Sequence, residues 1–382
     1  MMMKIKGQMV GWESPIAVHP GEFLAEMLEE FRMTQADLAE RIGISTKVLN
    51  EIVKGKNPIT RTTAFKLSKV FPVSAEYWTN LQQIYEADKA RLEEGVRLAS
   101  EVKNYLPLLQ HTYKQLAALG GSFVSGLRWT EKSFQVIALE LQRFFGVDSF
   151  EYIGSTTQVA FRKHNRDNLD PYALAAWIRI GEIKAQKTQT VPYDEKKLKA
   201  SLPKLKRLSR ERKEAYLPEI EQMLADCGIV VAYMPLISNT HAQGAAKWVA
   251  PDKVLLMLNT HKRDEGKFWF NLFHELGHIL LHSKKECFVD LDTERDGKVE
   301  KEADEFAQKW LINDFDATII TFRKEMNTSH DIKSAVHAAA KANNVSDAII
   351  AGRLTNEFKH DRRIYAIMND FLQERIDTVN VL

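Results

Sequence analysis

The chain has 382 residues, more than one average domain, so we expect two or three domains that each bury a core. The formal net charge of only +2 excludes an overall electrostatic field that attracts nucleic acid or membrane. Any argument from charge therefore concerns local clusters of charged residues. The two cysteines, the absence of an apolar signal sequence at the N-terminus, and the lack of an apolar run of about 18 to 20 residues predict a reduced, cytoplasmic protein without a membrane span.

Residues 34–54 predict two short helices joined by a tight turn. Thr34 is suited to cap a helix over Gln35–Ile42, Gly43 ends it, and Ser45 can cap the next helix, which runs to about Lys54. Helix, short glycine turn and helix is the helix-turn-helix arrangement, whose second helix lies in the major groove of DNA.

The surface of the second helix fits contact with DNA. From Arg41 to Lys69 there are seven basic residues and one acid, Glu51, a local charge of +6. Val48, Leu49 and Ile52 are expected on the buried side of this helix. The residues expected to contact DNA are Gln35, Ser45, Thr46, Lys47, Asn50 and Lys54. A plain helical bundle with a solvated basic face is the alternative.

These residues resemble the Cro/repressor-type helix-turn-helix family and, more narrowly, antitoxins of the HigA/VapI kind. The matching residues are His19-Pro20-Gly21-Glu22, Thr34-Gln35-Ala36-Asp37-Leu38-Ala39, Ile44-Ser45, Gly55-Lys56, Ile59-Thr60, Thr63-Ala64 and Tyr77-Trp78-Thr79-Asn80-Leu81-Gln82. The resemblance implies a homodimer that binds double-stranded operator DNA, often at its own promoter and beside a toxin gene.

The middle of the chain reads as a helical scaffold. Residues 87–119 are charged and helix-prone, and Gly120-Gly121-Ser122 is the expected boundary. From Lys184 to Lys213 there are eleven basic residues and three acids, a local charge of +8. This run is either an accessory phosphate-contacting surface or a solvated helix face.

From Cys227 to Asn259 the pattern changes from helix to strand. Three short runs rich in β-branched and aromatic residues, 228–233, 245–249 and 254–259, predict a small sheet. An apolar segment follows and continues into His274 without a helix-breaking residue, so we expect a helix from about Lys262 to His282.

That helix contains His274-Glu275-Leu276-Gly277-His278. Residues four apart share one helix face, so His274 and His278 can bind one zinc ion while Glu275 lies beside it as a general base. Catalytic zinc normally takes three protein ligands, and the amphipathic helix near residue 300 offers Glu300 as the third. Asp304 can support a ligating imidazole from behind.

Two alternatives for the third ligand stay open. Glu302 would replace Glu300 if the helix were set differently. His282 lies on the same face as His274 and His278, but three ligands along one straight helix would spread over about 12 Å, so we expect it to support the site. Tyr233 and His241 are candidate donors to an oxyanion.

The segments His274–His282 and Glu300–Leu311 resemble the ImmA/IrrE family of metallopeptidases, and the relation of Glu300 to Asp304 is similar to the ligand helix of gluzincins. With the preceding strands the resemblance runs from Cys227 to Leu311. Most relatives end the second helix with a proline, whereas here Asn313-Asp314 follows. In such a site zinc lowers the pKa of water toward about 7, and Glu275 accepts its proton and passes it to the leaving amine.

The sequence of residues 339–346 resembles that of residues 38–45, which indicates a second turn of helix-turn-helix shape. We expect this turn to be part of the peptidase domain. We therefore expect a mainly α chain with a small β-sheet (α+β): a helix-turn-helix DNA-binding domain (1–88), a helical connector (89–225) and a zincin-like metallopeptidase domain (226–382). The predicted function is a regulator of antitoxin type that cleaves a specific protein or itself. The alternative is a non-proteolytic antitoxin whose zinc domain binds a toxin.

Overall fold

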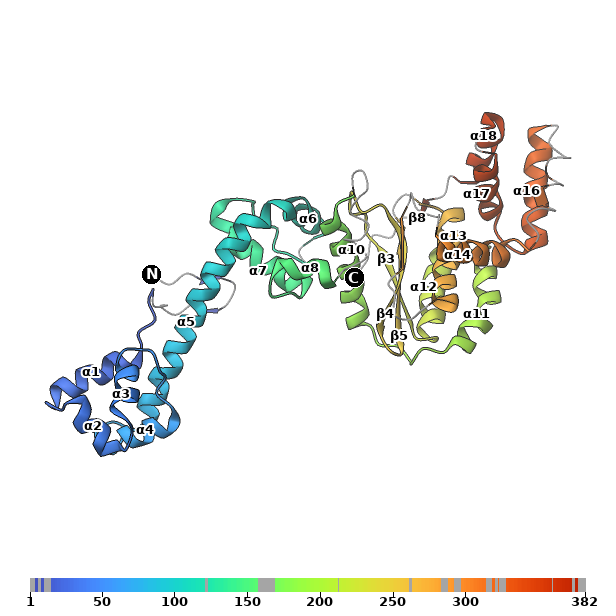
Figure 1. Ribbon diagram of the computed structural model, residues 1–382. Helices are drawn as coiled ribbons and strands as arrows, with labels where there is room; N and C mark the ends of the chain where they lie inside the picture. Colours follow the sequence, from blue (N-terminus) through green and yellow to red (C-terminus); the bar gives the residue numbers. More distant parts are fainter. Residues whose placement is uncertain are drawn as a thin grey trace. The chain divides into compact units, whose positions relative to one another are not determined.

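The computed structural model describes residues 4–5, 8–9, 15–120, 123–156, 169–211, 213–260, 263–282, 288–291, 297–313, 318–319, 322, 328–358, 360–372 and 375–376. They form two compact units, Met1–Asn104 and Tyr105–Leu382 (Figure 1). The division into three domains stays a prediction. Within the described ranges, no helix combines the length and the apolar character needed to cross a membrane.

The first unit is a helical bundle. It consists of β1 (Lys4–Ile5), β2 (Gln8–Met9), α1 (Pro20–Glu30), α2 (Gln35–Ile42), α3 (Thr46–Val53), α4 (Arg61–Leu67) and α5 (Ala75–Asn104). The strands β1 and β2 pair with each other antiparallel. The core contains Leu24, Leu38, Leu49, Leu67 and Trp78, all fully buried.

The caps explain the boundaries of α2 and α3. Thr34 and Asp37 form a reciprocal capping box at the start of α2, and Gly43 ends this helix in the left-handed conformation at φ 61°. Ser45 caps α3 by accepting a hydrogen bond from the backbone N–H of Val48 (3.3 Å). Both predicted helices and their capping residues are therefore present.

The second unit begins with α6 (Leu106–Ala118), α7 (Phe134–Phe145), α8 (Ile153–Thr156) and α10 (Pro171–Lys187), with the short 3-10 helices η1 (Glu131–Ser133) and η2 (Phe150–Tyr152). The next helices are α11 (Glu195–Leu208) and α12 (Lys213–Ala225). Leu198, Leu202 and Leu205 of α11 are buried in the same core as the sheet that follows.

A four-stranded mixed sheet lies at the centre of this unit. Its strands are β3 (Ile229–Met234), β4 (Ala242–Ala250), β5 (Lys253–Asn259) and β7 (Phe288–Leu291), in the order β3-β5-β4-β7. The β3–β5 pair is parallel, and β4 pairs antiparallel with both β5 and β7. The sequence predicted three of these strands but not β7, and β4 begins earlier than expected.

Helices cover both faces of the sheet, which explains why every residue of β3 is buried. In Figure 1, α10 lies on one side of the strands, while α12 and α13 (Glu265–Leu281) lie on the other. Gly181 lets α10 approach the sheet closely, because a Cβ there would overlap Met257. Leu256 and Leu258 share the opposite core with Phe273 and Leu276 of α13.

The remaining elements pack on α13 or on the helix α17 that contacts it. They are β6 (Arg263–Asp264), α14 (Lys298–Leu311), α16 (Ser329–Asn343), α17 (Asp347–Glu357), α18 (Arg362–Phe371) and β8 (Arg375–Ile376), which pairs with β6. Asn344 ends α16 in the left-handed conformation and Ser346 precedes α17, so the predicted echo of the first unit is present in shape. Because Ile350 and Leu354 are buried in the core of the second unit, α17 is a structural element there.

The fold class was predicted correctly: the chain is mainly helical with a small sheet. The helix that carries the two histidines begins at Glu265, where the side chain of Asp264 accepts a hydrogen bond from the backbone N–H of Lys267 (2.9 Å). The expected start at Lys262 lies outside the described residues.

Candidate metal centre and DNA-binding helix

Three of the predicted ligands converge at the centre of the second unit. His274 and His278 lie one turn apart on α13, and Glu300 lies in the first turn of α14. The two histidine Nε2 atoms are 3.0 Å apart, and Oε2 of Glu300 is 3.2 Å from that of His274 and 3.5 Å from that of His278. In the part of the chain that the structure describes, these residues form the one cluster with donor atoms close enough for a metal ion.

The dimensions of this triangle fit zinc. Tetrahedral zinc holds nitrogen and oxygen ligands at about 2.0 to 2.1 Å, so two ligand atoms on one ion lie roughly 3.3 Å apart. The three observed separations bracket this value. Two imidazoles and one carboxylate are also the donor set of catalytic zinc sites that leave a fourth position open.

A close approach of two helices brings Glu300 to the histidines. Gly277 lies between the ligands on α13, and a Cβ there would come within 3.2 to 3.3 Å of Phe306 and Ala303 on α14. Glycine at this position therefore lets α14 pack directly on α13. The small residue in the motif explains why a carboxylate that is 22 residues beyond His278 can reach it.

Each of the two histidines has a partner on its other ring nitrogen. Nδ1 of His274 lies 2.9 Å from Oδ1 of Asp304, and Nδ1 of His278 lies 3.0 Å from Nδ1 of His282. Nε2 of His282 is in turn 3.2 Å from Oε2 of Glu302. Asp304 and His282 thus contact the ring nitrogens of His274 and His278 that do not face Glu300.

One assignment of protons satisfies the contacts of the two Nδ1 atoms and of His282, and it leaves a lone pair on each of the two Nε2 atoms, where a metal ion could bind. His274 donates Nδ1–H to Asp304, and His278 donates Nδ1–H to His282. His282 then carries its proton on Nε2 and donates it to Glu302. Glu302, an alternative third ligand in the sequence, therefore anchors His282 in this geometry.

The surroundings of His278 and Glu300 favour the protonation states that can bind a cation, a neutral imidazole and an ionised carboxylate. Burial lowers the pKa of His278 below its usual value, and the neighbouring histidines act in the same direction against Glu300. Burial raises the pKa of Glu300, but His274 and His278, which donate to its carboxylate whenever their Nε2 atoms carry protons, outweigh burial and hold this pKa below its usual value. A neutral imidazole beside a carboxylate is the state that binds a cation.

Glu275 lies beside the ligands, buried to 0% exposure between α13 and the sheet. Its carboxylate faces Gly244 of β4, where a Cβ would overlap both the carboxylate and Cγ of Glu275. Sequence reasoning did not single out Gly244. A glycine in the middle of a strand is the signal that could have found it, because such residues mark a close approach.

The two candidate oxyanion donors fall at different places. The hydroxyl of Tyr233 on β3 donates to the carbonyl of Leu217 (2.9 Å), so it is held by the backbone. His241 precedes β4 and takes a positive φ of 52°. Of the two cysteines, Cys227 is a buried free thiol and Cys287 lies outside the described residues.

The first unit presents α3 as its candidate DNA-binding helix. Ser45, Thr46, Lys47 and Lys54 are exposed, whereas Gln35 and Asn50 are half-buried. The oxygen of Ser45 accepts the capping hydrogen bond described above. These six residues lie on α2, on α3 or at the caps of α3.

One prediction about α3 was wrong. Leu49 and Ile52 are buried as expected, but Val48 is 39% exposed. The helix has only eight residues, and the bundle covers one side of it, so its first turn projects beyond the core. An apolar side chain is thereby exposed next to Lys47, on the surface expected to face DNA.

Much of the basic run in the second unit lies on a solvated helix face. The leucines of α11 turn inward, and the basic side chains turn outward. Ion pairs compensate several of them: Lys184 with Glu221, Lys199 with Glu195, and Lys204 with Glu219.

Comparison with known proteins places the first unit in a family. Residues 24–78 match the family described as helix-turn-helix. Virulence-associated protein I of Dichelobacter nodosus is 33% identical over 94 residues, which are 23% of this chain and 87% of that protein. The chain belongs to the helix-turn-helix family. Another relative in this family is an uncharacterized HTH-type transcriptional regulator of Haemophilus influenzae, 34% identical over 23% of this chain and 82% of its own length.

Solved structures of helix-turn-helix proteins are similar to the same part of the chain. An addiction module antidote protein of the HigA family from Coxiella burnetii is 35% identical over 22% of this chain and 92% of its own, with a TM-score of 0.21. The Pseudomonas aeruginosa antitoxin HigA, solved with the higBA promoter, is 35% identical over 22% of this chain and 90% of its own, also with a TM-score of 0.21.

This helix-turn-helix protein carries a second family domain. Residues 225–355 match the family described as IrrE N-terminal-like domain, a metallopeptidase family. The match begins just before β3 and ends within α17, so it contains the sheet, both ligand helices and the helix pair that echoes the first unit. The resemblance of both halves, seen in the sequence motifs, is confirmed.

Proposed function

We propose that this chain is a DNA-binding transcriptional regulator of antitoxin type whose IrrE-like domain is a zinc-dependent endopeptidase. Its substrate would be a specific protein partner or the chain itself. The observation that carries the enzymatic part is the triangle of His274, His278 and Glu300, with the buried carboxylate of Glu275 beside it. A site that only held the fold together would have no use for a carboxylate base at that position.

The residues divide the work of peptide hydrolysis. A bound zinc ion would lower the pKa of a water molecule and polarise the scissile carbonyl. His274, His278 and Glu300 would hold the ion, while Asp304 and His282 would fix the orientation of the two imidazoles. Glu275 would accept the proton of the attacking water and give it to the leaving amine.

Replacing Glu275 by Gln tests the enzymatic part, because the amide keeps the shape but cannot accept the proton. The full-length variant is expected to bind as much zinc as the wild type and to lose cleavage of the chain itself or of the protein encoded by the adjacent gene. Zinc content is measured by mass spectrometry and cleavage by gel electrophoresis. Unchanged cleavage by the Gln variant would show that Glu275 is not the base, and no cleavage by the zinc-loaded wild type would favour a domain that only binds its partner.

The DNA-binding part rests on the first unit and its family. Lys47 and Lys54 would contact phosphates, Thr46 and Asn50 would reach base edges, and the exposed Val48 would meet a thymine methyl group. Gln35, at the start of α2, and Ser45, at the cap of α3, would contact the backbone. The Pseudomonas aeruginosa HigA was solved with promoter DNA, and its sequence is similar over this unit.

We also propose that the protein binds its operator as a homodimer, because a two-fold protein reads two half-sites about one helical turn of DNA apart. Sedimentation of the full chain with a fragment of its own upstream DNA measures the stoichiometry. Two chains on one fragment are expected. One chain on each fragment, at saturating protein, would contradict the proposal.

A further inference from the structure

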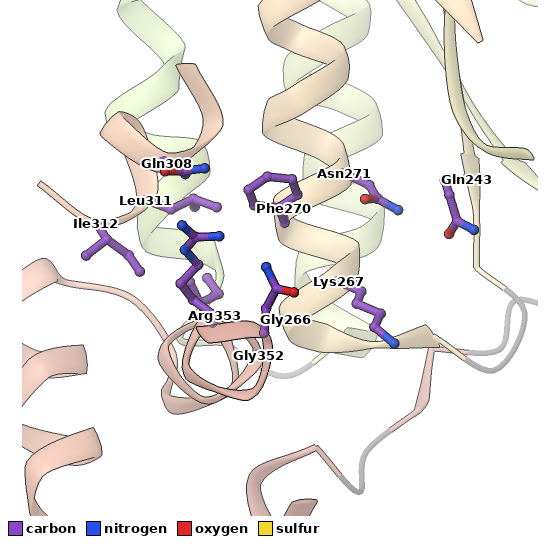
Figure 2. Close-up of a pocket in the computed structure, with 12 residues that line it drawn as sticks. Gln243, Gly266, Lys267, Phe270, Asn271, Gln308, Leu311, Ile312, Gly352 and Arg353 are labelled. Carbon is purple, nitrogen blue, oxygen red and sulfur yellow. The ribbon is translucent and has the colours of Figure 1, made fainter. Parts of the chain in front are cut away.

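A cavity of about 260 Å³ lies on the face of α13 that carries His274 (Figure 2). Its lining includes Phe270 and Asn271, which precede His274 by four and three residues and therefore share its side of the helix. The ring centroids of Phe270 and His274 are 6.3 Å apart. The cavity thus ends one helical turn, about 5.4 Å, before the metal centre.

A β-bulge in β4 directs the side chain of Gln243 into this cavity. Ala242 and Gly244 lie opposite successive residues of β7, so Gln243 between them is an extra residue. The side chain of Asn259 donates a hydrogen bond to the carbonyl of Ala242 (2.9 Å) and holds the bulge in place. In a regular strand, neighbouring side chains point to opposite faces of the sheet. Here both positions face α13, because Gln243 lines the cavity and Gly244 contacts Glu275.

The amide of Gln243 is buried without a partner. The residue is 4% exposed, and its Nε2 makes no hydrogen bond with any residue that the structure describes. Asn271, which is 5% exposed, extends toward it from α13 in Figure 2. A buried donor without an acceptor costs free energy, which a ligand that supplies the acceptor recovers. An amide that served only the fold would be expected to have its partner within the fold.

This amide lies close to the candidate base. Gln243 is the strand neighbour of Gly244, where an added Cβ would overlap the carboxylate of Glu275. Across the cavity, Asn271 and Glu275 are four residues apart and share one helix face, with a rise of about 6 Å between them. An extended peptide rises about 3.3 Å for each residue. A peptide that passes between Gln243 and Asn271 therefore reaches Glu275 within about two residues.

We propose that Gln243 binds a backbone carbonyl of the peptide substrate, within about two residues of the scissile bond. The inference rests on the proposed peptidase function. Nε2 of Gln243 donates a hydrogen bond to this carbonyl, and Asn271 lies on the other side of the same peptide group. A peptide group fits because it is uncharged, whereas a charged group would lose more hydration in so buried a position. The contact orients the chain whatever its side chains are.

Calorimetry with the full-length, zinc-loaded protein tests this contact without requiring turnover. The probes are alanine peptides that extend in either chain direction from a hydroxamate, which supplies a common anchor at the zinc ion. In each series one member keeps every amide, and each of the others replaces a single amide by a trans-alkene that keeps the shape but lacks the carbonyl. In one series, a single replacement is expected to weaken binding roughly tenfold, because it leaves the buried donor unpaired.

Gln243→Leu connects this sensitivity to the residue, because leucine has a similar size and no donor. The variant should bind the all-amide probe roughly tenfold more weakly than the wild type and should no longer distinguish it from the alkene probe. Its zinc content should be unchanged, and its unfolding temperature should be equal or higher, since an unpaired buried donor has been removed. Gln222→Leu, the same change at an exposed position of α12, is the control and should leave both affinities unchanged.

Equal affinity of the amide and alkene probes in both series would overturn the proposal, and so would a sensitivity that survives Gln243→Leu. A lower unfolding temperature of this variant with unchanged affinity would make Gln243 a structural residue. Absence of hydroxamate binding by the zinc-loaded wild type would overturn the metal centre and this inference with it. If the expected sensitivity is found while the zinc-loaded wild type cleaves neither itself nor a partner, the peptidase function fails and the peptide contact stands.

Discussion

His282 supports His278 from behind: their Nδ1 atoms lie 3.0 Å apart, and the far side of the His282 ring contacts Glu302 at 3.2 Å. His278 thereby has an acceptor for its Nδ1 proton on its own helix, one turn further on. The arrangement differs from that of His274, whose acceptor is a carboxylate on α14. The contacts of His278 therefore also lead to a carboxylate, that of Glu302, but through the ring of His282.

This relationship predicts that His282→Ala weakens zinc binding by about ten- to a hundredfold, the usual effect of removing a residue behind a ligand. The fold should persist, because α13 ends at Leu281 and His282 is only its C-cap. Competition with a chromogenic chelator measures the affinity. His330→Ala, at an exposed position of α16, is the matched control and should leave the affinity unchanged. Equal affinities of the two variants would mean that His282 has no part in metal binding.

Gly244→Ala is expected to abolish most peptidase activity while zinc stays bound. The added Cβ overlaps the carboxylate of Glu275, which has no room to move because it is fully buried. Measuring zinc content and cleavage on the same sample distinguishes an effect on the base from an effect on the metal ligands. Gly95→Ala on α5, where nothing lies within 4 Å of an added Cβ, is the control, and it should raise stability by about 0.5 to 1 kcal/mol. Normal cleavage by Gly244→Ala would argue against Glu275 as the base.

Reversing the charge of Lys47 is expected to weaken binding to operator and unrelated DNA alike. It should also reduce the dependence of log K on log salt by about one unit for each phosphate that the variant no longer neutralises. Asn50→Ala should instead reduce the preference for the operator, because an amide reads bases. Fluorescence anisotropy at several salt concentrations measures both. Lys341→Glu, at an exposed position of α16, is the control. If Lys47→Glu binds as this control does, α3 does not contact DNA as proposed.

The stability of the first unit should depend on the protonation of His19. Its Nδ1 accepts a hydrogen bond from the N–H of Gly21 (2.9 Å) and caps α1. Burial lowers the pKa of His19 below 6.5, with Lys89 acting in the same direction and Glu22 against it. The unfolded chain therefore binds the proton more tightly, so the stabilisation is present above pH 6.5 and is lost as the pH falls through the lowered pKa.

Hydrogen exchange of α1–α3 in the full chain measures this effect. Protection should fall on acidification below pH 6.5 in the wild type. His19→Asn keeps a capping acceptor without the titration and should flatten the dependence, whereas His19→Ala should cost about 1 kcal/mol at neutral pH. A pH dependence that is identical in wild type and His19→Asn would assign it to another group.

Local sequence signals predicted α2, α3, the two ligand histidines and the identity of both halves, because caps, helical periodicity and the spacing of four act within a few residues. They failed where packing decides. Val48 has the composition of a core residue, but the bundle does not extend over the first turn of α3. Strand β7 pairs with β4 although β5, β6 and α13 lie between them in the sequence, and the parallel pairing of β3 with β5 cannot be inferred from either segment alone.

The sequence by itself determined that two imidazoles and a carboxylate lie together on one helix and that Glu300 and Asp304 share a face of another. It could not determine how closely those helices approach. That depended on Gly277 against α14 and Gly244 against Glu275, where the absence of a side chain lets residues distant in the chain come into contact. The same kind of packing brings the first turn of α13, at Gly266, against the backbone of Ala348 on α17. Local chemistry is encoded within a few residues, whereas a site built from several elements exists only once the core is packed.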